Sequence, residues 1–391
     1  MRICIITPAY RWGDGAVYLA QLIQILEPMA DSIHVITGST SEAFKLMLNK
    51  NIYVVNIEHH SANNMAMKLC KYIVSQLRIS RELLKVSNQI DTAVFFFGSS
   101  LIIPMLTAKV AQIKVLLIVT GSISESVKWI YKGRGGHIFY YVARMNEKIN
   151  YFLCDRIGIM LMSCQSSIRS LGLDHYKGKI VPFPIVVLDK KQFNIGNRLC
   201  DRGHIIGYVG RLSREKGVLQ LARAIPLMLS RKSDLSFIIV GTGPLMYEMK
   251  QILEKSGCLD KVQFTGWVPH EEVAVYMHKL RFHVLPSYTE NFGGAGLEAM
   301  ACGAISVANA VGGLPDVIVD GETGFLLKDN EPQTIADKIL EVWDNPDLCK
   351  IQNAANVFVE KNLLCEKVVE NSLQMLAKMD STAMRKGSRT N

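Results

Sequence analysis

Two glutamates flank a glycine-rich stretch in the second half of the chain. Glu290 and Glu298 are separated by seven residues in SYTENFGGAGLEAMACG (287–303), and Gly293 and Gly294 lie between them. Glycines at a helix start leave backbone amides uncovered, so a phosphate or sugar can approach the backbone closely. Carboxylates accept pairs of hydrogen bonds from vicinal hydroxyls. The stretch therefore predicts a sugar or nucleotide site between a loop carboxylate and a helix carboxylate.

The same residues allow a purely structural interpretation. Ser287-x-x-Glu290 matches a capping box, in which the two side chains satisfy the amides of a helix start. Glu298 could likewise be an exposed residue of a surface helix. Taken one at a time, the two glutamates do not decide between a ligand site and these structural roles.

A second stretch, GYVGRLSREKG (207–217), combines two cations with a helix start. Arg211 follows the end of an expected strand, Lys216 comes five residues later, and Gly217 opens a helix expected to run to about Ser230. Backbone amides at a helix start, with cations beside them, bind anions. The alternative is a basic turn that only caps a strand.

Short apolar runs alternate with amphipathic segments along the chain, which indicates parallel β-α-β units. The predicted fold class is therefore α/β, with two doubly wound domains and a cleft between them. Ligands of such sheets bind at the carboxyl ends of the strands. Strands are expected at 3–7, 34–37, 52–57, 93–97, 115–119, 157–162, 205–210, 237–241, 262–266, 282–287 and 304–309.

The predicted domains follow from this pattern. Residues 1–190 form a first Rossmann-like domain and residues 191–360 a second, joined by a linker within 182–203. Residues 361–391 are expected to hold a C-terminal helix that packs back on the first domain, and then a flexible basic tail.

Composition limits the class of protein. A chain of 391 residues exceeds the size of a single core, and 49% apolar with 20% charged residues is globular. The most apolar run, Thr92 to Ala108, is interrupted by Gly and Pro and predicts strand, turn and helix, not a membrane span. The first residues are too briefly apolar for a signal peptide, which predicts a cytoplasmic protein. Nine cysteines without a C-x-x-C pair favour reduced thiols and disfavour a structural zinc site.

Charge is unevenly distributed. Residues 1–190 hold 21 Lys and Arg against 12 Asp and Glu, a net of +9, whereas residues 191–391 hold 23 of each. The excess predicts a first domain that meets an anionic partner, nucleic acid or a membrane face, unless it is only a solvated surface. No basic, aromatic-rich motif of the usual nucleic-acid-binding modules is present, so nucleic acid is not expected.

Four motifs in order resemble one family. GYVGRLSREKG, VQFTGWVPHEEV, VLPSYTENFGGAGLEAMACG and VGGLPDVIVDGETGFLL, with their order and spacing across about residues 204–345, are similar to the donor half of the family 4 (group 1) retaining glycosyltransferases of the GT-B fold. The first half resembles the family only in outline, through ITPAYRWGDGAVYLAQL (6–22). The resemblance implies a transferase that uses a nucleotide sugar.

The resemblance also implies roles for the charged residues. Glu298 would hold the ribose hydroxyls of the nucleotide, and Glu290 would contact the donor sugar. Arg211 and Lys216 would neutralise the diphosphate, so that Glu290, Arg211 and Lys216 form the expected catalytic set.

The remaining implied contacts come from backbone amides. Those of Phe292, Gly293 and Gly294 would complete the diphosphate cradle. Gly13 and Gly15, in the first loop of the other domain, would approach the same phosphates.

The chain departs from the family after the strand expected at 115–119. Many members carry a histidine there, close to the reacting sugar, whereas this chain reads VTGSISES. Ser122, Ser124 or Glu125 could occupy that space. The linker also lacks the usual N-G-V-D.

The predicted function is transfer of a sugar from a nucleotide-diphosphate sugar, a UDP- or GDP-sugar, to a glycan or lipid-linked acceptor hydroxyl, with retention of configuration. No cofactor and no metal are expected, because the cations would stabilise the leaving diphosphate and the chain has no D-x-D triplet. The alternatives are a nucleotide-sugar epimerase or hydrolase of the same fold, and a non-catalytic binding protein.

Two segments of the first half combine cations with large apolar residues. NMAMKLCKYIVSQLRISRELLK (64–85) has them at roughly helical spacing, and VKWIYKGRGGHIFYYVARM (127–145) adds aromatic residues. Such segments can lie in a lipid interface, which predicts peripheral contact with an anionic membrane at its inner face and an acceptor near it. The alternative is that both helices only pack on the sheet.

Overall fold

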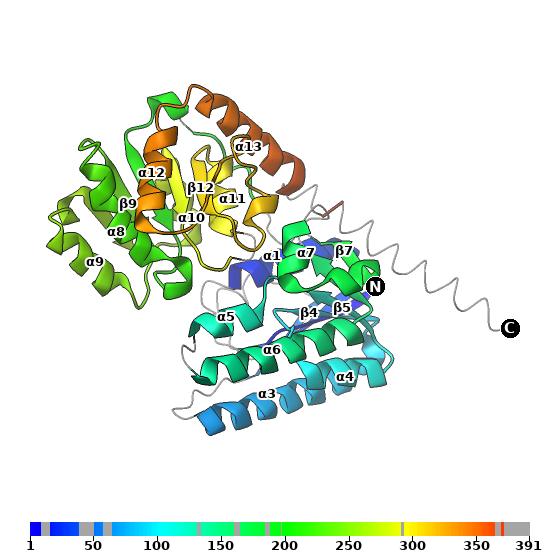
Figure 1. Ribbon diagram of the computed structural model, residues 1–391. Coiled ribbons are helices and arrows are strands. Elements are labelled where there is room, and N and C mark those ends of the chain that lie inside the picture. The colour runs from blue at the N-terminus through cyan, green and yellow to red at the C-terminus, as the bar shows by residue number, and fades with distance from the viewer. Residues whose placement is uncertain are drawn as a thin grey trace. The chain divides into compact units, whose positions relative to one another are not determined.

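The computed structural model describes residues 1–8, 16–38, 51–57, 65–130, 134–159, 165–183, 188–196, 198–290, 293–363 and 369–370. The described chain divides into two compact units. Unit 1 lies within residues 1–162, 171–187 and 365–391, and unit 2 within residues 163–170 and 188–364. Figure 1 labels the elements of both.

Unit 1 contains a seven-stranded parallel sheet with the order β3-β2-β1-β4-β5-β6-β7. Its elements are β1 (Arg2–Ile6), α1 (Ala16–Leu26), β2 (Ser32–Thr37), β3 (Ile52–Asn56), α3 (Met65–Val86), β4 (Thr92–Phe96), α4 (Ile102–Val110), β5 (Lys114–Ile118), α5 (Ile123–Ile130), α6 (Arg134–Leu153), β6 (Arg156–Ile159) and β7 (Ile180–Pro182). Helix α7 (Gln165–Leu171), which follows β6 in the chain, belongs almost wholly to unit 2.

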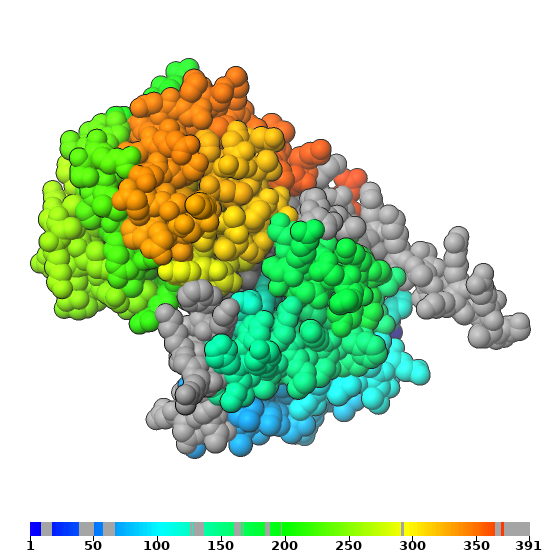
Figure 2. All heavy atoms as spheres, viewed as in Figure 1, coloured from blue at the N-terminus to red at the C-terminus, as the bar shows by residue number. Residues whose placement is uncertain are grey.

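The central strands of this sheet are apolar throughout because both faces are covered. All five residues of β4 are buried, as are the last four of β1 and of β5. Right-handed crossovers put α1 on one face and α3, α4 and α6 on the other. Helix α4 packs between α3 and α6, and the side chains of these helices reach the molecular surface (Figures 1 and 2).

Unit 2 contains a six-stranded parallel sheet with the order β10-β9-β8-β11-β12-β13. Its own core is built from buried Leu, Ile, Val and Phe side chains of strands and helices. Its elements are β8 (Ile205–Val209), α8 (Val218–Leu229), β9 (Ser236–Val240), α9 (Met246–Lys255), β10 (Val262–Gly266), α10 (His270–Met277), β11 (Phe282–Leu285), α11 (Gly294–Ala301), β12 (Ile305–Asn309), β13 (Phe325–Leu327), α12 (Pro332–Val342) and α13 (Leu348–Leu363).

The strand order of unit 2 places two loops at a topological switch point. Strands β8 and β11 pair in parallel, with Phe282 opposite Ile206 and His283 opposite Gly207. From β8 the chain proceeds outward on one side of the sheet, and from β11 it proceeds outward on the other. Ligands of doubly wound sheets bind where the order reverses in this way. The predicted fold class, two doubly wound parallel α/β domains, is confirmed.

Most predicted strands are present, and the apolar run from Thr92 to Ala108 is strand, turn and helix as expected. Two short strands, β7 and β13, were missed, because three residues carry too little periodicity to be recognised. Within the described residues, none of the helices has both the length and the apolarity that a membrane span needs. The predicted basic tail at 381–391 lies outside the described residues.

Candidate functional site

The loop between β8 and α8 carries the two predicted cations. A short 3₁₀ turn, Arg214–Lys216, ends at Gly217, which has a left-handed backbone (φ +66°) and precedes the first residue of α8. The helix then runs to Leu229, as the sequence predicted. Lys216 is the last residue of this turn, and its side chain reaches the loop that follows β11.

The loop between β11 and α11 carries Glu290 and the glycines. Side-chain amides fix its start: Asn309 donates to the carbonyl of Ser287 (3.1 Å), and Asn330 donates to the carbonyl of Pro286 (3.2 Å). Gly293, also left-handed (φ +63°), caps α11.

A side chain at position 293 would collide with its surroundings, because a Cβ at Gly293 would lie 2.4 Å from Leu314 Cδ2. The first intrahelical amide of α11 is that of Gly296, which donates to the Gly293 carbonyl (2.7 Å). The amides of Gly294 and Ala295 precede it, at the positive end of the helix.

These two loops are joined by an ion pair and a backbone hydrogen bond. Lys216 Nζ lies 2.9 and 2.7 Å from the two carboxylate oxygens of Glu290, and both side chains are largely buried. The Tyr288 amide donates to the Glu215 carbonyl (2.9 Å). The chains approach so closely that a Cβ at Gly217 would lie 1.8 Å from the Pro286 carbonyl oxygen. Two of the predicted catalytic residues are thus in direct contact at the switch point.

The capping-box interpretation of Ser287 and Glu290 is wrong. Ser287 does bond Glu290, but through its hydroxyl to the carboxylate (3.1 Å), and α11 begins only at Gly294. Glu290 therefore belongs to a loop and is held by Lys216 and Ser287, with its carboxylate at the carboxyl edge of the sheet.

Arg211 is held by a residue that the sequence did not single out, Glu215. The Arg211 guanidinium donates to a Glu215 carboxylate oxygen (2.6 Å), and the same oxygen accepts from the Ser213 hydroxyl (2.6 Å). Partial burial acts to raise the pKa of Glu215, but the hydrogen bonds from Ser213 and Arg211 outweigh it and the pKa is lowered. Arg211 is 68% exposed, so its charge reaches the solvent side of the loop.

Glu298 is not the exposed helix residue of the structural interpretation. It is only 7% exposed, and its carboxylate lies 2.9 Å from His270 Nε2 at the start of α10. The hydrogen bond with Glu298 raises the pKa of His270, against an opposing effect of partial burial. His270 is a second residue that the sequence reasoning missed. It stands in the quoted motif VQFTGWVPHEEV, where a histidine after proline marks a helix start but names no partner.

The described residues bring Arg211, Lys216 and Glu290 together in two adjoining loops, while Glu298 lies one turn into α11 with Gly293 and Gly294 at the helix start. Three predicted site residues, Phe292, Gly13 and Gly15, lie outside the described residues.

In unit 1, the serines that follow strand β5 are tied to a buried carboxylate. Glu147 of α6 is fully buried and accepts from the Ile123 amide (2.6 Å) and from the Ser124 hydroxyl (2.8 Å). Ser122 contacts both Ser124 (2.8 Å) and Glu147 (3.3 Å). Ser122 and Ser124 therefore fix the start of α5, and Ser124 is fully buried.

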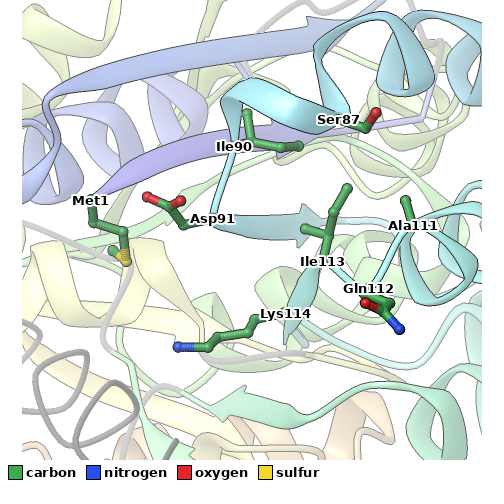
Figure 3. A pocket seen from close by; sticks show the side chains of 8 residues that line it. All are labelled: Met1, Ser87, Ile90, Asp91, Ala111, Gln112, Ile113 and Lys114. Carbon is green, nitrogen blue, oxygen red and sulfur yellow. The ribbon is translucent and has the colours of Figure 1, made fainter. Parts of the chain in front are cut away.

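A pocket of about 440 Å³ lies elsewhere in unit 1 (Figure 3). Its lining includes Met1, Asp91 and Lys114, which stand at the amino ends of β1, β4 and β5. Asp91 is paired with Arg2 (2.8 Å), and the Arg2 hydrogen bond lowers the pKa of that carboxyl. Because ligands of doubly wound sheets bind at the opposite edge, this pocket is not the candidate site.

The described residues contain no group of three or more His, Cys, Asp and Glu side chains placed to share a metal ion. The candidate site accordingly consists of cations, carboxylates and helix-start amides.

Proteins similar to this chain in sequence are glycosyltransferases. Residues 190–356 match the family model "Glycosyl transferases group 1". An uncharacterized glycosyltransferase of Methanocaldococcus jannaschii, MJ1178, is 25% identical over 91% of this chain and 92% of that protein. The 2-deoxystreptamine glucosyltransferase of Streptomyces kanamyceticus is 31% identical over 40% of each chain, so the match spans less than half of that relative.

Solved structures share the fold at low sequence identity. HepE of Anabaena, in complex with UDP, has a TM-score of 0.75 at 16% identity, covering 97% of this chain and 100% of that one. Sucrose-phosphate synthase of Thermosynechococcus elongatus has a TM-score of 0.74 at 18% identity, covering 98% and 100%. At this level of identity the two matches show a shared fold.

Proposed function

Residues 190–356 match the family model of group 1 glycosyl transferases, and from that match we propose that the chain moves a sugar from a nucleotide-diphosphate sugar to an acceptor hydroxyl. The acceptor is a glycan or a lipid-linked sugar, and the anomeric configuration is retained. The proposal assigns donor binding to the switch point of unit 2.

The observation that carries this proposal is the contact between Lys216 and Glu290 at the carboxyl ends of β8 and β11. A cation suited to a diphosphate and a carboxylate suited to sugar hydroxyls stand side by side there. Glu298, buried one turn into α11, offers the second carboxylate for the ribose hydroxyls. In a nucleotide sugar the diphosphate links the sugar to the ribose, so a donor needs all three functions.

The transfer breaks the bond between the sugar C1 and the β-phosphate oxygen, and the electron pair of that bond leaves with the diphosphate. The acceptor oxygen forms a new bond to C1 and gives its proton to the departing phosphate. Lys216, Arg211 and the amides of Gly293 and Gly294 stabilise the charge that grows on the diphosphate. Glu290 holds the sugar hydroxyls while C1 develops oxocarbenium character.

The proposed donor is a UDP-sugar, with a GDP-sugar as the alternative. HepE of Anabaena, which shares the fold, has been solved with UDP-glucose. Such a match at 16% identity supports the fold and makes UDP-glucose the first donor to try.

The experiment that tests the proposal is a thermal-shift screen of UDP-, GDP- and ADP-sugars against the whole chain, followed by product analysis. A bound donor raises the melting temperature because it binds only the folded state. The expected result is stabilisation by one nucleotide class, absent in Glu298→Gln. The anomeric configuration of the product, read by NMR, tests retention. If none of the nucleotide sugars stabilises the protein at millimolar concentration, the donor-site assignment fails.

A second candidate function follows from Ser124. Ser124 is one of the residues that could occupy the place of the histidine, and it is buried against Glu147. A structural residue there favours a protein that binds a nucleotide sugar without transferring it; a hydrolase or epimerase of the same fold stays a further alternative. Product analysis separates these functions. A transferase gives a glycosylated acceptor, a hydrolase gives free sugar, an epimerase gives an isomeric donor, and a binding protein gives none of these.

A further inference from the structure

Unit 1 exposes an unusually large set of apolar side chains on three neighbouring helices. Thirteen of the nineteen exposed large hydrophobic residues in the described chain belong to α3, α4 or α6. Isolated exposed apolar residues are normal, whereas a cluster on one face marks an interaction surface. The thirteen are Met67, Leu69, Ile73, Val74, Leu77 and Leu84 of α3, Leu106 and Val110 of α4, and Ile138, Tyr141, Val142, Met145 and Phe152 of α6.

On α6 these residues form a single stripe. Ile138, Tyr141, Val142 and Met145 recur at spacings of three and four residues, and Phe152 follows two turns later. Such spacing puts them on one side of a helix. The opposite side of α6 is buried through Glu147 and Tyr151, so the exposed stripe points away from the sheet. Tyr141 and Phe152 are 68% and 71% exposed.

The stripe continues across the neighbouring helices. Helix α4 contacts both α3 and α6, and all three lie on the same face of the unit 1 sheet (Figure 1). Val110 at the end of α4 is 83% exposed. The apolar side chains of the three helices therefore make one surface of unit 1, which we call the α3–α4–α6 face and which reaches the molecular surface in Figure 2.

The same helices are strongly basic. Together they carry nine Lys or Arg and only two Glu. One of these acids, Glu147, is fully buried and paired with Arg144 (3.2 Å), and the other, Glu82, is paired with Lys85 (2.7 Å). Lys109 of α4 is paired with Asp155 (2.8 Å). On α3 the exposed cations Arg78, Arg81 and Lys85 stand among the apolar residues of the same side.

We propose that the α3–α4–α6 face docks on an anionic lipid membrane. Apolar side chains of α6 and α3 enter the boundary between head groups and acyl chains, and the cations of α3 meet the lipid phosphates. The inference goes beyond the proposed transferase function and does not depend on it, because it concerns helices of unit 1, whereas the donor site is assigned to unit 2.

Charge decides between this occupant and two others. A second copy of the chain would bring two basic faces together, which repels. A nucleic acid would meet the cations, but the thirteen exposed apolar residues would gain no contact with phosphates or sugars. A membrane of anionic lipid satisfies both properties of the face, since it offers negative charge and an apolar interior.

The test is sedimentation of the whole chain with sucrose-loaded vesicles. The probes are vesicles of phosphatidylcholine alone and vesicles of phosphatidylcholine with about 30% phosphatidylglycerol, which gives the surface a negative charge. Binding is expected only to the anionic vesicles, and it should fall as salt rises because screening shortens the reach of surface charge.

Two variants separate the charged from the apolar contribution. Arg78→Glu/Arg81→Glu should weaken vesicle binding on the order of tenfold or more, since each near-surface cation contributes to binding an anionic bilayer. Ile138→Asn/Val142→Asn should weaken it by about tenfold through loss of insertion. All four side chains are exposed, so both variants are expected to fold.

Matched controls lie on exposed positions of unit 2. Arg223→Glu/Lys255→Glu changes the net charge by the same amount, and Val275→Asn/Val357→Asn removes two exposed valines. Both controls should bind vesicles as the unchanged protein does. Circular dichroism and melting temperature establish that every variant is folded.

Three outcomes would overturn the proposal. One is equal sedimentation with neutral and anionic vesicles at low salt, or none with either. Another is a stable dimer in analytical ultracentrifugation that Ile138→Asn/Val142→Asn dissociates, which would identify a second copy as the occupant. The third is loss of vesicle binding in the charge variant alone together with tight, salt-dependent binding of polyuridylate, which would identify a nucleic-acid surface.

Discussion

Each carboxylate of the candidate site has a partner within the protein. Glu290 contacts Lys216, Glu298 contacts His270, and Glu215 contacts Arg211. The three partners differ in chemistry and exposure, so the carboxylates are held in different ways. Substitutions at the individual residues should therefore have different effects on binding, turnover and stability.

Glu298→Gln and Glu290→Gln should fail differently. Glu298→Gln should weaken binding of the nucleoside diphosphate itself by about tenfold or more, because a charged acceptor for the ribose hydroxyls is lost. Glu290→Gln should lower kcat by about 10²-fold with a smaller effect on that affinity. Calorimetric titration with the nucleotide and steady-state kinetics measure the two quantities. If both variants are fully active, the two glutamates have only structural roles.

Arg211→Ala should lower kcat by about 10²–10³-fold, the typical effect of removing a preorganised charge donor. Since cations and amides stabilise the leaving group in the proposed mechanism, activity should survive dialysis against EDTA. Arg223→Ala, an exposed arginine on α8, is the control and should keep full activity. Activity lost to EDTA and regained with Mg²⁺ or Mn²⁺ would contradict the proposed mechanism.

The pair of His270 and Glu298 makes stability depend on pH. The pKa of folded His270 is raised by its hydrogen bond to Glu298. A raised pKa contributes stability that is complete below the unfolded value, about 6.5, and is lost as pH rises through the folded value. His270→Gln should therefore lower the melting temperature more at pH 5.5 than at pH 8.5. In a Glu298→Gln background this pH dependence should disappear, and its persistence there would place the cause elsewhere.

Among the elements, the sequence predicted the frame of the site better than its contacts. The runs around β8 and β11 and the helix starts at Gly217 and Gly293 follow from hydrophobic periodicity and glycine placement. The contact between Lys216 and Glu290 joins residues 74 positions apart. Such a contact depends on the strand order, which local patterns do not encode. His270 was missed for the same reason, since its partner Glu298 is 28 positions away in the chain. Glu215 was missed although its partners Arg211 and Ser213 lie within four residues of it.

Gly217 holds the two loops of the site together. Gly217→Ala combines left-handed strain with a Cβ only 1.8 Å from the Pro286 carbonyl, so the loops must separate. We expect a loss of more than about 2 kcal/mol in unfolding free energy, and a loss of activity as Lys216 moves from Glu290.

Gly257 is a matched control for this substitution, because its φ is also +66° but no atom lies within 4 Å of a Cβ there. Gly257→Ala should cost only the backbone strain, about 1–2 kcal/mol, and leave activity unchanged. Chemical denaturation measures both free energies. Equal losses of unfolding free energy in the two variants would mean that the close approach of the two loops contributes nothing to stability.

At the scale of the whole molecule, two sheets with separate cores predict two unfolding transitions. Because the proposed donor site lies in unit 2, a bound donor should raise one transition in differential scanning calorimetry and leave the other in place. Gly257→Ala, a destabilising change within unit 2, should lower the same transition and so identify it. A single transition that moves as a whole with the donor would show that the two units unfold together.

The pairing of Lys216 with Glu290 also bears on how the proposed donor would enter. The ammonium group is neutralised before any diphosphate arrives, so donor binding would be an exchange of one anionic partner for another. Few mobile ions are displaced in such an exchange, since the lysine never faces bulk electrolyte alone. Donor affinity should then vary little with ionic strength, and each binding event would release the Glu290 carboxylate at the moment when a sugar hydroxyl comes within its reach.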